Sequence, residues 1–333
     1  MQKMKISIVI AVYNEEKAIL DCLDVLINQD YPKKDYEIVV VNDGSTDNTK
    51  ESLKDKTRQA TLSGIGLKTI NFNKNKGRVI ARKVVAEEAK YNNILFIDSR
   101  CSAQEDILKS IKKINHQPLV GNPVIDHSKS IWDRFNWLFR KKLYYPYYGE
   151  KYNSVYITKH NFDKIGKGTG IFFCNKQLFL SSQPQKSDHY VSDDTSLLWN
   201  IVQKKRILKH SEVKAIYQSR VNVFSIIKHT FQRGPKFVDY YLSFKKRRFW
   251  LYIFLPLFFL ISMITSLILQ PHLLIGYLIT LFLFFVILSF FLADSTKDFL
   301  TVLLCLPLVG VIFESGIVWG IGIKVFRSWK KKK

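Results

Sequence analysis

Cysteine is scarce in this chain and shows no paired spacing. Only four cysteines occur among 333 residues: Cys22, Cys101, Cys174 and Cys305. A small, irregular set of this kind excludes a disulfide framework as the basis of the fold. We therefore expect reduced thiols in a domain that faces the cytosol.

Acidic residues are also few, with 28 Asp and Glu against 51 Lys and Arg, for a net charge of +23. A nucleic-acid-binding protein could have this balance. The basic runs, however, adjoin apolar segments, at 245–248 and 330–333. Basic clusters in such places attract anionic lipid headgroups and mark the cytoplasmic side of a membrane. We therefore expect membrane lipids as partners, and no nucleic acid.

Charge is absent altogether from two long apolar segments, 249–269 and 273–293, and a third apolar segment covers 299–323. Each reaches the ~20 residues that a helix needs to cross a bilayer. The sequence therefore predicts a multi-pass protein of the cell membrane. By contrast, the basic N-terminus is followed by only a short apolar run, Ile6–Tyr13, so we expect no signal peptide.

The third apolar segment decides the topology. Basic residues ahead of 249 place the preceding domain in the cytoplasm, and three full spans would then leave the basic C-terminus outside, against the positive-inside tendency. Because the segment carries Pro307, Glu314 and several glycines, it could be broken, re-entrant or packed against the other two. We expect the C-terminus on the inside.

Short β-prone runs alternate with segments of helical spacing across the first 115 residues. This alternation predicts an α/β domain with a mostly parallel, Rossmann-like sheet and helices on both faces. The expected strands are 6–12, 36–41, 67–72 and 94–97, and the expected helices are those around 19–27, from about 47, 78–90 and 104–115.

The periodicity weakens after Pro118. A glycine-rich turn there leads into a short strand, an acid pair begins a helix, and residues 213–217 can form a further strand. The stretch just ahead of the spans mixes apolar, aromatic and basic residues, which is typical of an interfacial helix. We divide the chain into a catalytic domain, an interfacial segment and a transmembrane region, at 1–220, 221–248 and 249–333.

Polar, turn-forming residues follow all four of the first expected strands: "YNEE", "NDGSTD", "NKNKG" and "DSR". Loops and helix N-termini converge at the carboxyl ends of parallel strands, and ligands bind there. Loops are polar in most proteins, but four in succession point to one binding site.

The motifs resemble those of family-2 glycosyltransferases, which have the GT-A fold. The resemblance rests on "SIVIAVYNEE", "EIVVVNDGSTDNT", the Asn-x-Gly-x-x-x-Ala-Arg spacing in "NKGRVIAR" and the strand-terminal acid of "ILFIDSR", and it covers about the first 240 residues. It implies an inverting enzyme with a nucleotide-sugar donor. The membrane tail is similar to that of members that act processively or on lipid acceptors.

The resemblance implies a nucleoside pocket lined by Val12, Tyr13, Glu15 and Asp43, whose carboxylates accept hydrogen bonds from base N–H groups and ribose hydroxyls. Asp43 could equally serve as an Asx turn or helix cap. The resemblance also implies donor contacts from Lys76, Gly77, Arg82 and Ser99.

Asp98 corresponds to the first acid of the family's Asp-x-Asp signature, and so would hold a divalent metal, Mg²⁺ or Mn²⁺, that stabilises the leaving diphosphate. Arg100 stands where the second acid would be, which departs from the pattern. Its bidentate fork could contact the diphosphate, or the side chain could turn outward. We expect Asp98 to be the only carboxylate of this motif on the metal.

"VSDDTSL" resembles the family's Glu-Asp motif at a helix start, which puts Asp193 at the Glu position and Asp194 at that of the general base. Two acids also suit a helix N-terminus without any catalytic role. The preceding Gly168, Thr169 and Gly170 correspond to an acceptor-side loop, where glycine lets the backbone approach a sugar closely.

"HTFQRGPKF" has a partial likeness to the Gln-x-x-Arg-Trp motif of processive members. Pro235 intervenes and Phe237 stands where Trp would be, so we do not infer processive polymerisation. His229, Gln232 and Arg233 are candidate contacts to a diphosphate or lipid phosphate, with interfacial packing as the alternative.

The sequence thus predicts a membrane-anchored glycosyltransferase with a nucleotide-sugar donor and a lipid-linked or polyprenyl phosphate acceptor at the cytoplasmic face, in cell-surface glycan synthesis. One alternative is a non-catalytic nucleotide-sugar binder that works with glycan-assembly proteins. Another is a polysaccharide synthase, which three short spans make hard to build.

Overall fold

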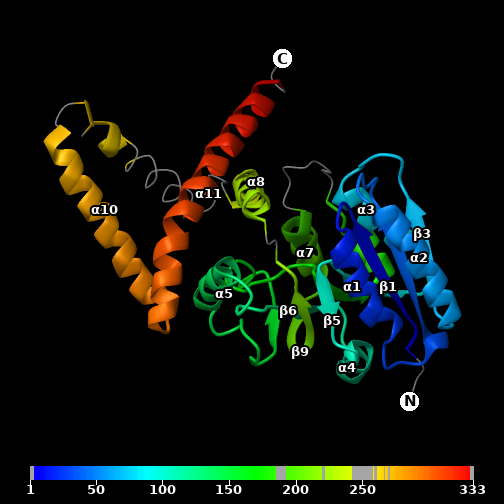
Figure 1. The fold of residues 1–333 in the computed structure, drawn as a ribbon. Helices are drawn as coiled ribbons and strands as arrows, with labels where there is room; N and C mark the ends of the chain where they lie inside the picture. The colour runs from blue at the N-terminus through cyan, green and yellow to red at the C-terminus, as the bar shows by residue number, and fades with distance from the viewer. Residues whose placement is uncertain are drawn as a thin grey trace. The chain divides into compact units, whose positions relative to one another are not determined.

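The computed structural model describes most of the chain, in two compact units (Figure 1). The first unit holds the described residues up to 126 together with 143–184 and 193–219, and the second holds 127–142 and the described residues from 222 onward. The described residues are 4–184, 193–219, 222–241, 258, 261–265, 267–268 and 271–330.

The first unit is built on one mixed sheet with the strand order β3-β2-β1-β4-β8-β6-β9-β5, and β7 pairs with β9. The first four strands along the chain are parallel neighbours, whereas β8 is antiparallel to both β4 and β6. The strands are β1 (Ile6–Val12), β2 (Tyr36–Asn42), β3 (Gly66–Asn71), β4 (Asn93–Ile97), β5 (Cys101–Ala103), β6 (Leu119–Ile125), β7 (Val155–Ile157), β8 (Ile171–Asn175) and β9 (Ile207–Tyr217).

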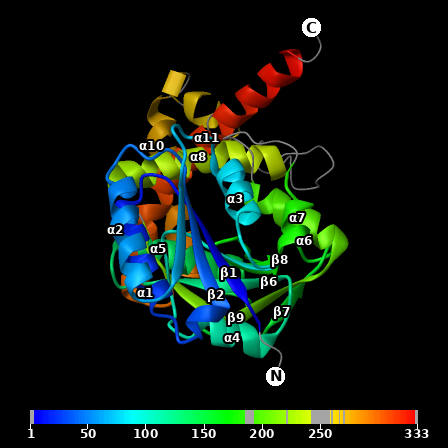
Figure 2. The ribbon, with the colours of Figure 1, turned by 90° about the vertical axis from the view of Figure 1, so that its right-hand side faces the viewer.

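Helices cover both faces of this sheet (Figure 2). Because side chains alternate along a strand, Ile8 and Ile10 of β1 pack with Ile19 and Leu23 in one core cluster, while α3 contacts β1 and β2 on the other face. The helices of this unit are α1 (Glu16–Ile27), η1 (Lys33–Asp35), α2 (Thr49–Leu62), α3 (Arg78–Glu87), α4 (Ile107–Ile114), α6 (Lys176–Leu180) and α7 (Asp193–Lys204).

The predicted α/β fold is confirmed, and the predicted strands and helices of the first 115 residues are all present to within a few residues at their ends. The parallel half of the sheet is the part that the sequence pattern revealed. The strands added after Pro118 bring antiparallel pairings. Strands β5 and β7 were not predicted because each has only 3 residues, and β6 was not because Gly121, Asn122 and Pro123 interrupt its apolar run.

The second unit contains α5 (Ile131–Leu143, of which 131–142 belong to it), α8 (Val223–Tyr241), α10 (Pro271–Leu292) and α11 (Thr296–Lys330). The predicted interfacial helix is α8. Helix α5 was not predicted, and its grouping with the C-terminal helices differs from the predicted boundary at 220. Phe135 and Leu138 of α5 form a buried cluster with Val302 and Cys305 of α11, which explains the grouping.

Two of the described helices are long and apolar enough to cross a membrane, over Leu274–Leu292 and Thr296–Arg327. They correspond to the second and third predicted spans, while the first predicted span, 249–269, lies largely outside the described residues. Helix α11 runs without interruption through Pro307. Of the three options left open for this segment, the structure therefore supports packing against neighbours, since α11 contacts both α8 and α10.

Glycines allow α8 and α11 to cross at close range. A Cβ atom on Gly234 of α8 would collide with the backbone of Gly316 on α11, and one on Gly316 would collide with the carbonyl oxygen of Phe231. Gly320, one turn further along α11, would meet Pro235 Cα at 2.6 Å. Small residues spaced by four let helix backbones approach closely, so this crossing depends on the absence of side chains.

Candidate active site

The polar loops after β1 and β2 hold each other at the carboxyl edge of the sheet. Asn14 donates from its backbone N to Ser45 Oγ at 2.9 Å, and its side-chain oxygen accepts from the backbone N of Thr46 at 2.8 Å. These bonds join "YNEE" to "NDGSTD", as the convergence of strand ends predicts.

The loop after β3 is joined to the same place through Asp43. The Asp43 carboxylate is buried and accepts from the backbone N–H groups of Lys76 and Gly77, at 2.7 and 3.0 Å. Beside it, Gly44 has a left-handed φ of 67° and approaches the backbone of Lys74 so closely that a Cβ atom would collide. In this structure Asp43 therefore orders the edge of the predicted nucleoside pocket.

Glu15 and Arg100 form a two-pronged ion pair. Arg100 Nε donates to Glu15 Oε1 at 2.8 Å, and Arg100 Nη2 lies 2.5 Å from Glu15 Oε2. Arg100 Nη1 also donates to the carbonyl oxygen of Gln218 at 3.3 Å. The guanidinium that stands in place of the second acid of the signature is thus partnered by a residue from the loop after β1, and it does not turn outward.

Asp98 follows β4 and is half-buried. Its Oδ1 accepts from the backbone N of Arg100 at 3.1 Å, and its own backbone N donates to the carbonyl oxygen of Gly170 at 2.9 Å. The Cys22 thiol donates to the Asp98 carbonyl oxygen at 3.9 Å. These contacts fix the strand end and leave Asp98 Oδ2 without a hydrogen bond to any described residue.

Among the side chains around Asp98, only the Asp98 carboxylate is suited to bind a metal ion. Within the described part of the chain no group of three or more His, Cys, Asp or Glu could hold an ion. Burial, with the nearby Asp98 charge, raises the pKa of Cys22 and of Cys101, so both stay protonated thiols and are poor ligands. The site therefore suits a hard cation bound through Asp98 and otherwise by substrate phosphates and water.

The acid pair begins α7 and is held by two arginines one turn apart on α3. Arg78 Nε donates to Asp193 Oδ2 at 2.6 Å, and Arg78 Nη2 lies 3.5 Å from Asp194 Oδ2. Arg82 Nη1 donates to Asp194 Oδ1 and, at 2.5 Å, to Thr169 Oγ1. The Thr169 hydroxyl in turn donates to Asp194 Oδ1.

These contacts set the charge of Asp194. Burial alone would raise its pKa, but the guanidinium groups of Arg78 and Arg82 and the hydroxyl of Thr169 hold the pKa of this carboxyl well below its usual range. Asp194 is therefore ionised at neutral pH and is a weak proton acceptor in this arrangement.

Thr169 connects the acid pair to the end of β4, because its neighbour Gly170 accepts from the backbone of Asp98. Partial burial lowers the pKa of Arg78, but the carboxylates of Asp194, Asp193 and Asp98 raise it, which shows that all three acids lie around one guanidinium. The predicted metal ligand and the predicted base thus belong to one cluster in the first unit.

The remaining predicted site residues are distributed as follows. Val12 is buried at the end of β1 and its carbonyl oxygen accepts from Asp43 N at 2.8 Å, whereas Tyr13 is 43% exposed. Ser99 is buried, and Gly168 borders open space. The three predicted contacts on α8, His229, Gln232 and Arg233, belong to the second unit.

The sequence analysis missed Arg78. Its side chain is 42% exposed and is the only one recorded among the described residues as contacting both members of the acid pair. The signal was present in "NKGRVIAR", where Arg78 lies one helical turn ahead of Arg82 and so must share its face of α3.

Comparisons with known proteins show which family the chain is similar to. Residues 7–176 match the family described as "Glycosyl transferase family 2". A poly(ribitol-phosphate) beta-glucosyltransferase from Bacillus spizizenii is 43% identical over 96 residues, which is 29% of this chain and 15% of that protein. A protein of Methanococcus voltae, 32% identical over 105 residues and 32% of each chain, is named dolichyl N-acetyl-alpha-D-glucosaminyl phosphate 3-beta-D-2,3-diacetamido-2,3-dideoxy-beta-D-glucuronosyltransferase.

Among solved structures, the mannosyltransferase PcManGT from Pyrobaculum calidifontis, in complex with GDP-Man and Mn²⁺, shares the fold. Its TM-score is 0.53 at 17% identity, over 99% of this chain and 89% of that one. The chain spans at most about a third of the length of the two curated relatives named above. Because the family match covers slightly more than half of its residues, the chain belongs to glycosyl transferase family 2, with a GT-A fold.

Proposed function

We propose that this chain transfers a sugar, with inversion, from a nucleotide-diphosphate donor to a phosphate-bearing lipid acceptor at the cytoplasmic face of a membrane. The observation that carries the proposal is the cluster that joins Asp98, Thr169, Asp194 and the two arginines of α3 at the end of β4. The family, the fold and the apolar C-terminal helices agree with it.

Within this cluster the donor would bind by its two ends. The loops joined through Asn14 and Asp43 would receive the nucleoside, with Tyr13 exposed beside them. Arg78, the more exposed of the two arginines, is placed to meet the diphosphate, since a guanidinium binds phosphate oxygens through a rigid pair of donors. The structure assigns Arg100 to Glu15, so we give Arg78 the role that the sequence had suggested for Arg100.

Asp98 would hold a divalent cation in this site, Mg²⁺ or Mn²⁺. When bound there, such an ion supplies neutralisation of the charge that develops on the leaving diphosphate. Asp98 Oδ2 would be the oxygen that coordinates the ion, because Oδ1 accepts a hydrogen bond from the backbone N of Arg100.

The low pKa of Asp194 limits which acceptor group this carboxylate can activate. A carboxylate held by two guanidinium groups is a poor base for an alcohol, whose proton is tightly bound. A phosphate monoester is already largely ionised at neutral pH, because its second pKa is about 6. Asp194 then needs only to accept the remaining proton or orient the nucleophile, so the site favours a polyprenyl phosphate over a glycan hydroxyl.

The names of two relatives support an acceptor that contains phosphate. One relative is named for a dolichyl-linked sugar phosphate and another for a poly(ribitol-phosphate). The basic residues 245–248 before the first apolar segment support a cytoplasmic catalytic unit. Helix α11 is unbroken and long enough to span, which runs against the broken or re-entrant third segment that a C-terminus on the inside would require. Labelling of a C-terminal tag on intact spheroplasts would place the C-terminus outside.

A thermal-shift screen of nucleotide sugars against the detergent-solubilised chain tests the donor. We expect one nucleotide to raise the unfolding midpoint, and to raise it further with Mg²⁺ or Mn²⁺ in the parent but not in Asp98→Ala. Lys54→Gln, which changes one exposed side chain of α2, serves as the control. No shift with any uridine, guanosine, cytidine or deoxythymidine donor would contradict the proposal.

The Glu15–Arg100 pair also favours a second candidate, a non-catalytic nucleotide-sugar binder in a glycan-assembly complex. In this case the pair would mark an altered metal site in which donor still binds. The two candidates differ in turnover. A binder would show the thermal shift without releasing nucleoside diphosphate under any condition, whereas the enzyme would release it with acceptor present.

A further inference from the structure

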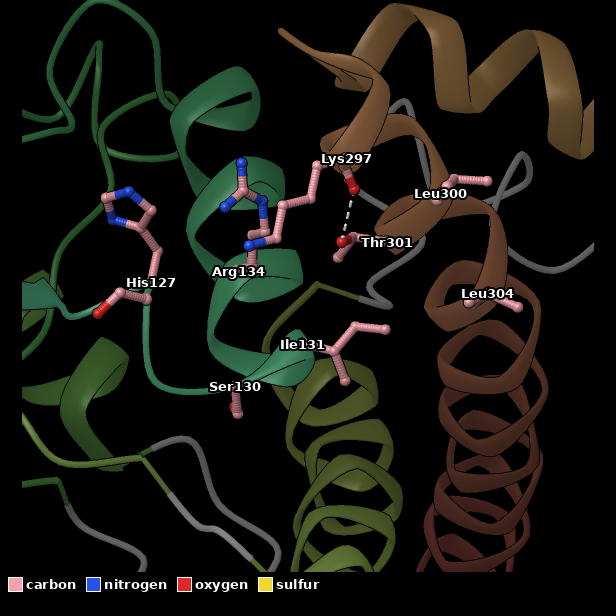
Figure 3. Close-up of a pocket in the computed structure, with 9 residues that line it drawn as sticks. His127, Ser130, Ile131, Arg134, Lys297, Leu300, Thr301 and Leu304 are labelled. Carbon is pink, nitrogen blue, oxygen red and sulfur yellow. Dashed lines mark hydrogen bonds between the residues drawn. The ribbon is translucent and has the colours of Figure 1, made fainter.

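The second unit contains a cavity of about 320 Å³ between α5 and the start of α11 (Figure 3). One side is polar, with His127, Arg134 and Lys297, together with hydroxyl groups such as that of Ser130. The other side is aliphatic and consists of Ile131, Leu300 and Leu304. The cavity shares no residue with the candidate active site.

The polar side carries two cations, of which Arg134 is paired with an acid and Lys297 is not paired with any described residue. Arg134 Nε donates to Asp298 Oδ1 at 2.6 Å, which fixes the guanidinium and occupies one of its nitrogens. Lys297 is exposed and extends from α11 toward the helix that carries Arg134 (Figure 3). No hydrogen bond or ion pair to its ammonium is recorded among the described residues, and no acidic residue lines the cavity. The Lys297 ammonium, together with the remaining N–H groups of the Arg134 guanidinium, favours an anionic ligand.

The cavity lies at the expected level of lipid headgroups. Lys297 and Asp298 begin α11, whose candidate span covers Thr296–Arg327. Helix α5 is tied to the turn before α11, because Asp294 accepts from Lys141 at 2.6 Å and lies 3.0 Å from Lys142 Nζ. Trp132 and Trp137 of α5 pack beside this junction, and tryptophan is enriched at membrane interfaces.

An apolar strip leads away from the cavity along α11. Leu300, Leu304, Leu308 and Val311 are all exposed and are spaced by four, four and three residues, so they share one face of the helix. At 1.5 Å per residue the strip is about 16 Å long, close to half of the ~30 Å hydrocarbon thickness of a bilayer. One acyl chain in one leaflet has this length.

We propose that this cavity binds the phosphate of an anionic bilayer phospholipid, whose acyl chain lies along Leu300, Leu304, Leu308 and Val311. Arg134 and Lys297 contact the phosphate, whereas the Ser130 hydroxyl lines the cavity but donates its proton to Asp133 Oδ2 at 2.7 Å. The lipid bound here is a resident of the membrane and not the sugar acceptor. It would fix α5 and α11 at one depth in the membrane.

Native mass spectrometry of the full chain in detergent tests this site, with phosphatidylglycerol and phosphatidylcholine of the same acyl chains as probes. We expect the parent to retain one phosphatidylglycerol in preference to phosphatidylcholine. Lys297→Gln should weaken retention of phosphatidylglycerol about fivefold, the effect of one cation near an anionic lipid. Lys297→Arg should retain the lipid, and Lys54→Gln, with the same charge change on an exposed α2 lysine, should leave it unaltered.

A second variant, Leu304→Ser, tests the acyl-chain path separately, and we expect it to weaken both phospholipids while the melting temperature stays that of the parent. Equal retention of phosphatidylglycerol by the parent and Lys297→Gln would overturn the proposal. Displacement of the bound lipid by an equimolar polyprenyl phosphate would also overturn it, because the cavity would then be an acceptor site. Neither result bears on sugar transfer by the first unit.

Discussion

Arg100 and Glu15 form an ion pair through two nitrogen–oxygen contacts, at 2.8 and 2.5 Å, that joins the loop after β4 to the loop after β1. Both side chains are largely buried, with 18% and 15% of their surfaces exposed. The residue that stands in place of the second acid of the family's signature is therefore held by Glu15. A site of this kind would take its metal ligands from Asp98 and the donor.

A double-mutant cycle on this pair should show strong coupling. Glu15→Gln or Arg100→Gln alone leaves a partly buried charge without its partner, whereas the double variant removes both charges. We expect the two single losses in the free energy of unfolding to exceed the double loss by about 2 kcal/mol, measured by denaturation of the purified chain. Additive losses would show that the pair is not formed in solution.

Arg78→Gln should move the acidic limb of the rate–pH profile to higher pH. Arg78 lowers the pKa of Asp194, so its removal raises that pKa, and Asp194 becomes protonated at a higher pH than in the parent. Because the parent limb lies below the usual pKa range of an aspartate, kcat/KM is measured from pH 7 down to the lowest pH at which the chain stays folded. Lys83→Gln, which removes an exposed cation of α3 that pairs with Glu87 at 3.8 Å, should leave the limb in place. An unchanged limb in Arg78→Gln would rule out Asp194 as the titrating group.

Asp98→Ala should abolish stimulation by metal. If Asp98 is the one carboxylate among the described residues that holds the ion, as proposed, we expect a loss of about 100-fold or more in kcat, the usual effect of removing one key electrostatic contact. Titration of Mn²⁺ into parent and variant measures it. Undiminished activity in Asp98→Ala, or a metal-bound structure with a second acid ligand, would contradict the single-carboxylate site.

Gly316→Ala should destabilise the second unit, because the added methyl group would collide with the carbonyl oxygen of Phe231 on α8. We expect a cost of about 1–3 kcal/mol, typical of overpacking, and a lower thermal unfolding midpoint. Gly322→Ala, on the same helix with open space at its Cβ position, is the matched control and should match the parent. Equal midpoints for the two variants would argue against the close crossing of α8 and α11.

The sequence predicted the parts of the fold whose signals are local. Uninterrupted apolar runs such as Ile6–Val12 and helical spacing such as that of Ile19 and Leu23 are set by the pleat of a strand and the turn of a helix. The antiparallel strands after Pro118 depend on contacts between residues far apart in the chain, such as Phe96 with Phe172, and a single sequence shows no such pairing.

In the candidate site, too, the sequence predicted the residues with local signals and missed the contacts between distant residues. Asp43, Asp98 and Asp194 could be placed because each lies at the end of a strand or the start of a helix, where the motif and the geometry coincide. The partners could not be placed. The contacts of Glu15 with Arg100, and of Arg78 with Asp193, bring together residues separated by 85 and 115 positions along the chain, and only the tertiary structure reveals them.

Helix α5 illustrates a further limit. Its apolar residues Phe135 and Leu138 follow helical spacing, but their partners Val302 and Cys305 lie in a segment that composition alone marks as a lipid-facing span. The sequence therefore pointed to α8 as the interfacial helix and did not reveal α5.

The most direct test of the account is sugar transfer itself. Membranes containing the parent, Asp194→Asn or Lys83→Gln are incubated with the donor found by thermal shift, a polyprenyl phosphate and Mn²⁺, and the glycolipid and nucleoside diphosphate are quantified by mass spectrometry. We expect equimolar products from the parent and from Lys83→Gln, and at least a tenfold lower rate from Asp194→Asn. Equal rates in all three, or no product with any donor, would contradict the proposed reaction.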